Sequence, residues 1–477
     1  MLRCRFRKWK MEMVRLLILL SCLFSVTTYA ASWSPAAPIT NSSPAYKEVS
    51  VSSIPTTGQF IATWTATNDS NYPTYSIYTP GSGWSNPARI SNSPSSIVLY
   101  NVLTSVNPTT GVVLAAWGDM TDSNPPIYSF YTPSSGWGAI GTIPGISGDY
   151  DADVSLSFIP TTGGFIATWT DNNTFFPYFS IYTPGMGWST SAQISGTFTN
   201  YFNVFTSVNP ATGTILATWG DGNPPYYPTY SFYNGSTWSA PLPITTSSTV
   251  RFYDVNSSFN SVTGQFLAMW GDDSTGLPTY SFYTAGSGWS PIATLSDSSG
   301  VAGDIINSVD PLTGQILATW SDYNNHNYPT YALYTPGSGW SSVATISTSF
   351  PAYSDVITSF DPITSQFFGT WADTNNNNYP TYSSLFLPFP PPSGLKGVQK
   401  KNNFAIVSEL FNSLTWQNDP GATSYQIYRN GILIATLDGN ATSYEDHDQP
   451  RKKQTYSVIA VHASGASTAA TVVVGGK

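Results

Sequence analysis

Acidic side chains recur along this chain at fixed distances from tryptophan, and repeated carboxylates are groups that bind cations or accept hydrogen bonds from a polar ligand. One set lies two residues after a recurring tryptophan and consists of Asp119, Asp171, Asp221, Asp272, Asp322 and Asp373. A second set of positions lies sixteen residues before the same tryptophans and consists of Glu48, Asn101, Asp153, Asn203, Asp254, Asp304 and Asp355. Eleven acidic residues therefore occupy two repeated positions.

The first set has two possible roles. An Asp that follows a strand commonly accepts hydrogen bonds from backbone N–H groups of the next loop and so fixes that loop. Alternatively, carboxylate and amide oxygens bind Ca²⁺, and the segments Asp322–Asn325 and Asp373–Asn377 are rich in both. On the second interpretation, Asp171, Asp322 and Asp373 are candidate ligands of a calcium ion. The sequence lacks the spacing of an EF-hand loop and indicates no other cofactor.

The second set lies where the first strand of each repeat is expected to begin. If those strands surround an axial channel, their acids gather at one mouth of it, and we predict that the ligand is bound there by Glu48, Asp153, Asp254, Asp304 and Asp355. Asp149 and Asp151 join Asp153 in an acidic group that interrupts the repeat. Such a group is typical of a solvated loop, although two carboxylates are also what a glycosidase requires. The sequence assigns a catalytic role to no residue.

The tryptophans define the elements that position these acids. The first series recurs every 50 to 53 residues, and a second series keeps step with it. The two series are Trp64, Trp117, Trp169, Trp219, Trp270, Trp320 and Trp371, and Trp33, Trp84, Trp137, Trp188, Trp238, Trp289 and Trp340. A fixed period of this size indicates a solenoid, a propeller or an array. In the sixth repeat, turns and a polar loop separate four strand-like runs, namely Asp304–Val309, Gln315–Ser321, Tyr328–Tyr334 and Trp340–Ser347.

The phase of the two series predicts a closed ring. The repeat region begins with a lone fourth strand, Trp33–Thr40, and ends after a third strand, Tyr379–Leu387. The N-terminal strand can complete the last sheet, which leaves no exposed terminal edge. We therefore predict an all-β fold in which residues 31–387 form a seven-bladed β-propeller closed by its N-terminal strand. The hairpin Tyr334–Ser341 resembles the Asp-box hairpin of sialidase-type propellers, without its Asp, and WD-repeat propellers close in a similar way. Both resemblances imply the fold alone.

A different pattern follows a proline-rich linker at residues 388–392. Apolar and aromatic strand positions and a strong hairpin turn occur in order at Trp416, Tyr425, Ile427, Asn430-Gly431, Tyr456, Val458 and Ala460. With this order, residues 393–477 resemble a fibronectin type III domain. The resemblance implies a seven-stranded, immunoglobulin-like β-sandwich and a role as a spacer or adhesion module.

The N-terminus indicates export. Residues 1–30 contain six basic residues, the apolar run Leu16–Val26 and a small-residue cleavage site at Ala30, as a signal peptide does. An uncleaved membrane anchor is the alternative, although the run is short for a membrane span. Both cysteines, Cys4 and Cys22, lie in this segment, so the mature chain has no disulfide or thiolate metal site. We predict a bacterial, monomeric protein that is secreted, periplasmic or at the cell surface, with no transmembrane segment after signal removal.

Charge narrows the choice of partner. Residues 31–392 hold 3 basic and 19 acidic residues, a net charge of −16, which argues against nucleic acid and leaves cations, basic proteins and neutral sugars. A sialidase needs three clustered arginines, and this region contains only Arg89 and Arg251; its single histidine, His326, argues against a His-based triad and a zinc site. We therefore favour an exported, non-catalytic binding or adhesion protein that recognises a glycan or an extracellular protein through the acidic loop face. A carboxylate-dependent carbohydrate-active hydrolase and a structural spacer are the alternatives.

Overall fold

The computed structural model describes residues 32–93, 98, 101–118, 125–144, 154–171, 173–200, 203–250, 254–295, 299–387, 389, 391–404, 407–419, 421–462 and 465–476. Two compact units contain these residues: Ser32–Phe386 and the smaller Leu387–Lys477. The fold is all-β, with 52% of the chain in strands and 2% in helix. The expected signal peptide, residues 1–30, lies outside the described residues, as do two positions of the proline-rich linker, 388 and 390.

Seven antiparallel sheets form the described part of the larger unit, and each contains one tryptophan of the first series. We number the sheets 1 to 7 in the order of these tryptophans. Their first strands are β3 (Ser50–Ile54), β8 (Leu103–Val106), β13 (Ser155–Ile159), β18 (Phe205–Val208), β22 (Asn256–Asn260), β27 (Ile306–Val309) and β32 (Ile357–Asp361). Their second strands are β4 (Gln59–Ala66), β9 (Val113–Trp117), β14 (Gly164–Thr170), β19 (Ile215–Gly220), β23 (Gln265–Gly271), β28 (Ile316–Asp322) and β33 (Gln366–Asp373). Their third strands are β5 (Tyr72–Thr79), β10 (Ile127–Thr132), β15 (Pro177–Thr183), β20 (Pro228–Tyr233), β24 (Pro278–Thr284), β29 (Tyr328–Thr335) and β34 (Tyr379–Phe386).

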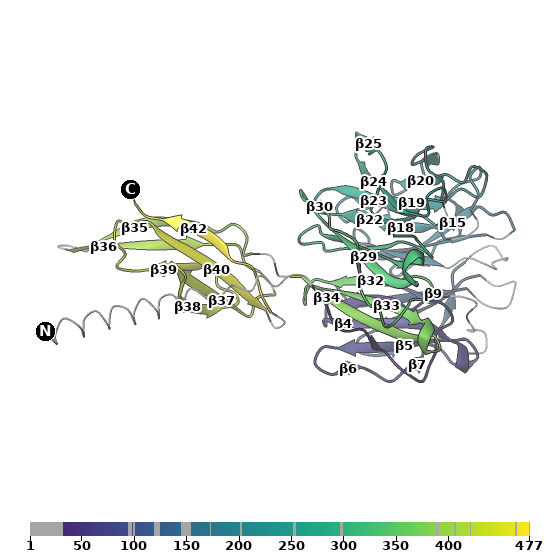
Figure 1. Ribbon diagram of the computed structural model, residues 1–477, viewed down its shortest axis with the longest axis horizontal. Helices are drawn as coiled ribbons and strands as arrows, with labels where there is room; N and C mark the ends of the chain where they lie inside the picture. The colour runs from purple at the N-terminus through teal and green to yellow at the C-terminus, as the bar shows by residue number, and fades with distance from the viewer. Residues whose placement is uncertain are drawn as a thin grey trace. The chain divides into compact units, whose positions relative to one another are not determined.

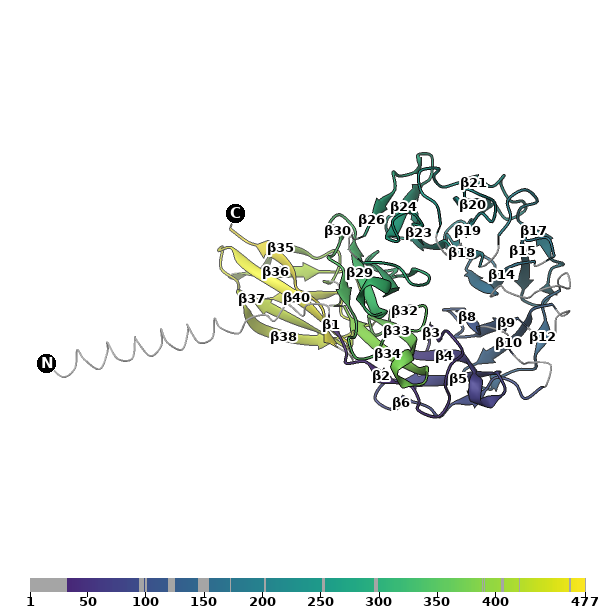
Figure 2. The same ribbon diagram turned by 45° about the vertical axis from the view of Figure 1, so that its right-hand side comes forward.

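The sheets follow one another around a ring (Figures 1 and 2). Their first strands contact one another in cyclic order, and β3 contacts both β8 and β32. Sheet 7 is completed by the start of the unit, because β1 (Ser32–Trp33) and β2 (Ala37–Pro38) pair with β34. Trp33 lies opposite Leu385, and Ala37 lies opposite Tyr382. The predicted pairing of the N-terminal strand with the last repeat is therefore confirmed.

A buried threonine hydroxyl links each of five sheets to the next one. It belongs to the residue before the motif tryptophan, and it donates to a backbone carbonyl just before or at the start of the next first strand. Thr319 Oγ1 donates to Val356 O at 2.7 Å, and Thr370 Oγ1 donates to Val49 O at 2.6 Å, across the closure between sheets 7 and 1. Thr63, Thr168 and Thr218 make the same bond. Because a buried hydroxyl must be paired, this bond explains the threonine and fixes neighbouring sheets relative to each other.

The second strand of each sheet lies between neighbouring sheets and is buried on both faces. Every residue of β28 is buried, as the largely apolar sequence of Gln315–Ser321 predicts. The Trp320 side chain is fully buried, and its Nε1 donates to Ser299 Oγ at 2.9 Å. Trp320 thus fills the space between sheets and also holds the segment that leads into the first strand of its own sheet.

The fourth strand is shorter than the sequence predicts. In sheet 6, the predicted strand Trp340–Ser347 is two short strands, β30 (Gly339–Trp340) and β31 (Ala344–Thr345), which both pair with β29. Between them, Ser341 Oγ accepts a hydrogen bond from Leu333 N at 3.0 Å, in place of a backbone carbonyl. The hydroxyls of Ser34, Ser85, Ser189, Ser239 and Ser290 make the same contact. In these six sheets the side-chain bond takes the place of a ladder bond at the break, whereas sheet 2 has the same break with Gly138 at this position, so the hydroxyl accompanies the break and does not cause it.

The remaining outer strands follow the same pattern. They are β6 (Gly83–Trp84), β7 (Ala88–Arg89), β11 (Gly136–Trp137), β12 (Gly141–Thr142), β16 (Gly187–Trp188), β17 (Ala192–Gln193), β21 (Leu242–Pro243), β25 (Gly288–Trp289) and β26 (Ala293–Thr294). Three of the loops between second and third strands contain a one-turn 3-10 helix: η1 (Thr67–Asp69), η3 (Tyr323–Asn325) and η4 (Thr374–Asn376).

The smaller unit consists of two antiparallel sheets. One contains β35 (Lys396–Phe404), β36 (Val407–Thr415) and β39 (Ser443–Asp446). The other contains β37 (Ser424–Arg429), β38 (Ile432–Asp438), β40 (Gln454–His462), β41 (Gly465–Ala466) and β42 (Ala470–Val474). Leu414 and Trp416 pack with Tyr425, Ile427 and Tyr456 in one core. The two sheets therefore share a single apolar interior.

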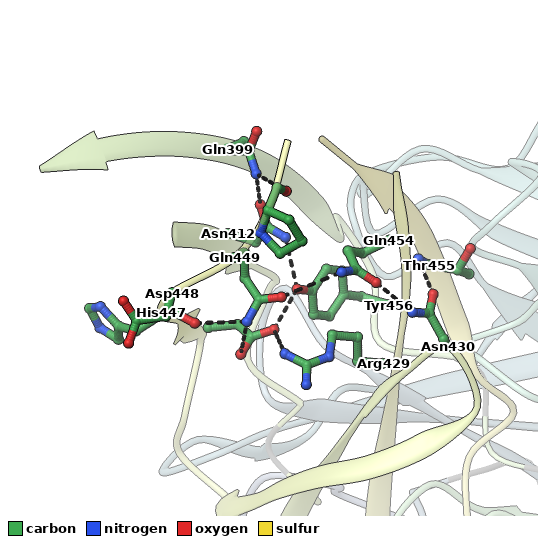
Figure 3. A network of polar contacts seen from close by, with 12 residues as sticks. Gln399, Asn412, Arg429, Asn430, His447, Asp448, Gln449, Gln454, Thr455 and Tyr456 are labelled. Atoms are coloured by element: carbon green, nitrogen blue, oxygen red, sulfur yellow. Dashed lines mark hydrogen bonds and ion pairs between the residues drawn. The ribbon is translucent and has the colours of Figure 1, made fainter. Parts of the chain in front are cut away.

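A buried polar network crosses the smaller unit (Figure 3). Asp446 Oδ2 accepts hydrogen bonds from Tyr456 Oη at 2.5 Å and from Arg429 Nη1 at 2.7 Å, and Asp446 Oδ1 accepts one from Gln449 Nε2 at 3.1 Å. Asn412 Nδ2 donates to Tyr456 Oη at 2.8 Å. Each oxygen of Asp446 has a partner within the unit, so this carboxylate stabilises the unit that contains it.

Candidate functional site

A channel lies inside the ring of sheets in the larger unit. Its cavity of about 420 Å³ is lined by residues from all seven first strands. Most of the lining side chains that are not apolar are hydroxyls and amides, including Ser52, Thr104, Ser257, Asn307 and Thr358. Such groups are neutral donors and acceptors. The channel is therefore a polar surface rather than an apolar core.

Carboxylates lie beside this channel where the first strands begin. Glu48, Asp304 and Asp355 line it, and Asp254 hydrogen-bonds to Asp304. The side chain of each Asp reaches toward the preceding sheet: Asp304 N donates to Asp355 Oδ1 at 2.7 Å, and Asn203 N donates to Asp254 Oδ1 at 3.0 Å. We call Glu48, Asp254, Asp304 and Asp355 the mouth cluster.

These bonds correct the predicted start of the first strand. The sequence predicts a strand from Asp304, but β27 begins at Ile306. The N–H of Asp304 is bonded to the carboxylate of Asp355 and not to a strand partner, so the ladder starts later. The mouth cluster thus replaces the strand hydrogen bonds at this end of the channel with bonds between carboxylates and backbone.

Two members of the mouth cluster, Asp304 and Asp355, have raised pKa values. Burial raises the pKa of Asp304 well above its ordinary value, and the neighbouring charges of Asp254 and Asp355 raise it further. Burial also raises the pKa of Asp355, although hydrogen bonds from Asp304 N and from Glu48 oppose that rise. A hydrogen bond between two carboxyl groups, such as the one that joins Asp304 and Asp254, requires one of the two to carry a proton.

Two polar side chains that line the channel are not paired by the protein. Neither Asn307 Oδ1 nor Asn307 Nδ2 has a hydrogen-bond partner among the described residues, and the same is true of Ser257 Oγ. Asn307 is 9% exposed and Ser257 is 8% exposed. An unpaired buried polar group costs about 1–3 kcal/mol. The channel therefore retains hydrogen-bonding capacity that the described protein groups do not use.

The candidate calcium ligands lie in separate sheets, and each is bonded to its own loop. Asp322 Oδ1 accepts hydrogen bonds from Asn324 N and Gly300 N, both at 3.0 Å, and Asp373 Oδ1 accepts one from Asn375 N at 3.0 Å. Asp171 accepts a hydrogen bond from Thr174 Oγ1 at 2.6 Å. These contacts are those of the loop-fixing role. In the part of the chain that the structure describes, no three His, Cys, Asp or Glu side chains are grouped to hold a metal ion.

Some of the predicted positions cannot be placed. Asp119, Asp149, Asp151 and Asp153 lie outside the described residues, so the acidic group around Asp153 and its part in the second set stay predictions. Within the described ranges, no helix is both long and apolar enough to span a membrane.

A second concave region lies at the loops between second and third strands of sheets 6 and 7. This cleft of about 440 Å³ is lined by Tyr323, His326, Asn327, Tyr328, Pro351, Thr374 and Asn375. His326 is the C-cap of η3 in this loop, and the repeated acidic positions gave no indication of Tyr323. The available signal was the difference between this loop and the equivalent loops of other repeats.

Comparisons with known proteins give a partial likeness. No protein-family model matches the chain, and no curated protein matches it. Among solved structures, the chain is similar to the fucose-specific lectin from Aleuria aurantia, with 11% identity, a TM-score of 0.41, and 64% of this chain and 96% of that chain covered. It is similar to AofleA from Arthrobotrys oligospora, with 9% identity, a TM-score of 0.38 and coverage of 87% and 92%. A structure named FN3tt mut matches 18% of this chain and 91% of its own, with 26% identity and a TM-score of 0.14. With TM-scores below 0.5, these likenesses carry no argument about function.

Proposed function

We propose that the protein is an exported, non-catalytic binding protein with two domains. The first is a seven-bladed β-propeller at residues 31–387, supported by the cyclic contacts of the first strands and by the pairing of β1 and β2 with β34. The second, at residues 393–477, is a fibronectin type III module that follows the linker at 388–392; its two sheets around Trp416 and Tyr425 support it. Residues 1–30 direct export, and the mature monomer is secreted, periplasmic or held at the cell surface.

The ligand that fits the propeller is a carbohydrate. The observation that carries this proposal is the unpaired amide of Asn307 in a channel lined with hydroxyls and bordered by the mouth cluster. Amides, hydroxyls and carboxylates are complementary to sugar hydroxyls, each of which donates one hydrogen bond and accepts others. A ligand that pairs these groups recovers the hydrogen bonds that the channel lacks when empty.

The geometry favours binding over hydrolysis. A glycosidase holds an acid and a second carboxylate on either side of the scissile bond, so both must reach the sugar. Asp304 and Asp355 are 9% and 4% exposed, and their side chains are bonded to neighbouring carboxyls and backbone. The mouth cluster therefore acts mainly as a negatively charged, hydrogen-bonding rim.

One observation favours the rival function, a carboxylate-dependent carbohydrate-active hydrolase. Burial and the neighbouring charges raise the pKa of Asp304, while hydrogen bonds from Asp304 N and Glu48 oppose the rise at Asp355, and two carboxyls in such different environments are the pairing that these enzymes use. A binding assay and a turnover assay separate the two functions.

The test uses the full mature chain on a glycan array and with chromogenic glycosides. We expect retention of a glycan without release of chromophore. The double variant Ser257→Ala/Asn307→Ala should weaken retention by about tenfold or more. Ser258→Ala is the matched control, because Ser258 Oγ is equally buried and unpaired but does not line the channel. Chromophore release that is lost in Asp304→Asn would establish the hydrolase instead. Silence in both assays would leave the spacer role and reject the proposal.

A further inference from the structure

Three of the described loops of the larger unit have the same backbone conformation. The loops between β4 and β5, β28 and β29, and β33 and β34 each contain a one-turn 3-10 helix, η1, η3 or η4. Two residues with positive φ follow each helix: Ser70 and Asn71 at 53° and 58°, His326 and Asn327 at 55° and 56°, Asn377 and Asn378 at 51° and 57°. The residue before each helix is extended, with φ from −89° to −83°. The η1 and η4 loops can therefore be compared with the η3 loop, position by position, on the same backbone conformation.

The η3 loop differs from its two counterparts in side chains that the shared backbone does not require. Tyr323 stands where the other loops have Thr67 and Thr374, and His326 stands where they have Ser70 and Asn377. The Tyr323 side chain is 63% exposed and lines the cleft between the loops of sheets 6 and 7, so much of its ring is open to a ligand. An aromatic ring beside a concave, polar region offers a ligand an apolar surface on which to pack.

These two side chains border the cleft between the loops of sheets 6 and 7. Its volume of about 440 Å³ lies within the range of small-molecule sites. His326 and Tyr328 lie beside each other in it, with ring centroids 5.7 Å apart, and Asn327, Thr374 and Asn375 add amide and hydroxyl groups. An aromatic wall facing amides and hydroxyls suits a ligand with one apolar face and a polar edge.

Charge narrows the class of ligand. Among the residues that the structure describes, neither Asp, Glu, Lys nor Arg lines the cleft. The acids that precede the two loops, Asp322 and Asp373, are bonded to Asn324 N and Asn375 N, which fixes them in the loop backbone. A cationic ligand would find no counter-charge in the described lining, and an anionic ligand would find only the imidazole of His326. A neutral ligand needs no counter-charge, so the uncharged lining does not disfavour its binding.

We propose that the cleft between the loops of sheets 6 and 7 is a second carbohydrate subsite for a neutral sugar ring. The apolar face of the sugar stacks on Tyr323 and is flanked by His326, while Asn327, Thr374 and Asn375 hydrogen-bond its hydroxyls. This inference rests on the proposed carbohydrate-binding function but not on the channel, because no residue of the channel lining takes part.

The experiment is saturation-transfer NMR on the full mature chain with a panel of methyl glycosides of neutral hexoses, 6-deoxyhexoses and N-acetylhexosamines. The test variants restore the residues of the sister loop in sheet 7, namely Tyr323→Thr and His326→Asn. The control is Tyr353→Thr, because Tyr353 is 48% exposed but does not line the cleft. Since the η4 loop already carries Thr374 and Asn377 on the same backbone, the test variants should melt within about 2 °C of the wild type.

We expect at least one glycoside to receive saturation, and Tyr323→Thr to weaken its binding by about tenfold while Tyr353→Thr leaves it unchanged. His326→Asn should weaken it less. If binding survives Tyr323→Thr but is lost in Ser257→Ala/Asn307→Ala, the cleft is rejected and the channel stands. If the opposite is found, the cleft stands and the channel is rejected. If no glycoside binds the wild type, both proposals fail.

Discussion

The two units of the molecule each bury a carboxylate network, and the networks are built in opposite ways. In the smaller unit, Asp446 accepts hydrogen bonds from Arg429, Tyr456 and Gln449, so the protein compensates its charge. In the larger unit, Asp304 faces Asp254, Asp355 and Glu48, and burial raises its pKa. The first arrangement stabilises a module. The second leaves charge beside a channel, which costs stability and is what a site for a polar ligand requires.

The largest effect should come from breaking the compensated network. Asp446→Ala removes the acceptor of Arg429 Nη1 and Tyr456 Oη and one of the two acceptors of Gln449 Nε2, and we expect a loss of about 3 kcal/mol of unfolding free energy in the smaller unit. Hydrogen exchange of peptides from β36 and β40, measured in the full chain, reports the stability of the smaller unit separately from that of the larger unit. Glu445→Ala is the control, because Glu445 is exposed and should change exchange little. Equal protection in both variants would show that the network does not stabilise the unit.

The same network predicts a loss of stability in alkali. Burial, together with the hydrogen bond to Asp446, raises the pKa of Tyr456 from 10.0 to about 12. In the folded state the phenol therefore keeps its proton to higher pH than in the unfolded state, so its contribution is complete below pH 10 and is lost as the pH rises toward 12. We expect the protection of β40 to fall over this window in the wild type. In Tyr456→Phe that fall should be smaller, and an identical profile would contradict the assignment.

A smaller effect of opposite sign is expected at the mouth cluster. Asp304→Asn keeps a donor for the hydrogen bond to Asp254 but removes a charge, so we expect the larger unit to gain about 1 kcal/mol at neutral pH. Because folding raises the pKa of Asp304, its stabilising contribution is complete below its ordinary value of 3.8 and is lost as the pH rises through the folded value. The advantage of the variant should therefore shrink in acid, as measured by urea denaturation at pH 7 and at low pH. A destabilised variant at pH 7 would show that the cluster is compensated after all.

Much of the larger unit could be predicted because its signals are local or periodic. Trp320 and its counterparts mark the second strand of each repeat. The positions of Trp33 and Tyr382 within the repeat predict that the N-terminal strand pairs with the third strand of the last sheet. Other features depend on partners distant in sequence. The bond from Thr319 to Val356 spans 37 residues, and the late start of β27 depends on Asp355, so neither is visible within one repeat.

The candidate site could be predicted only in part. From their fixed spacing, Asp254, Asp304 and Asp355 were expected to lie close together, and the structure has contacts among them. The unpaired state of Asn307 depends on what surrounds it in three dimensions, so no spacing reveals it. Tyr323 could have been identified from the sequence, because Thr67 and Thr374 occupy the equivalent positions in two other repeats. Its exposure is known only from the structure.

The larger unit is proposed to bind neutral carbohydrate and not to cleave it. One NMR experiment measures both properties: the full chain is incubated with the neutral methyl glycosides, and saturation transfer and the anomeric signals are followed in the same sample. We predict transfer from the protein to at least one glycoside, with anomeric signals unchanged over a day. Appearance of the free reducing sugar, or the absence of any transfer, would contradict the claim.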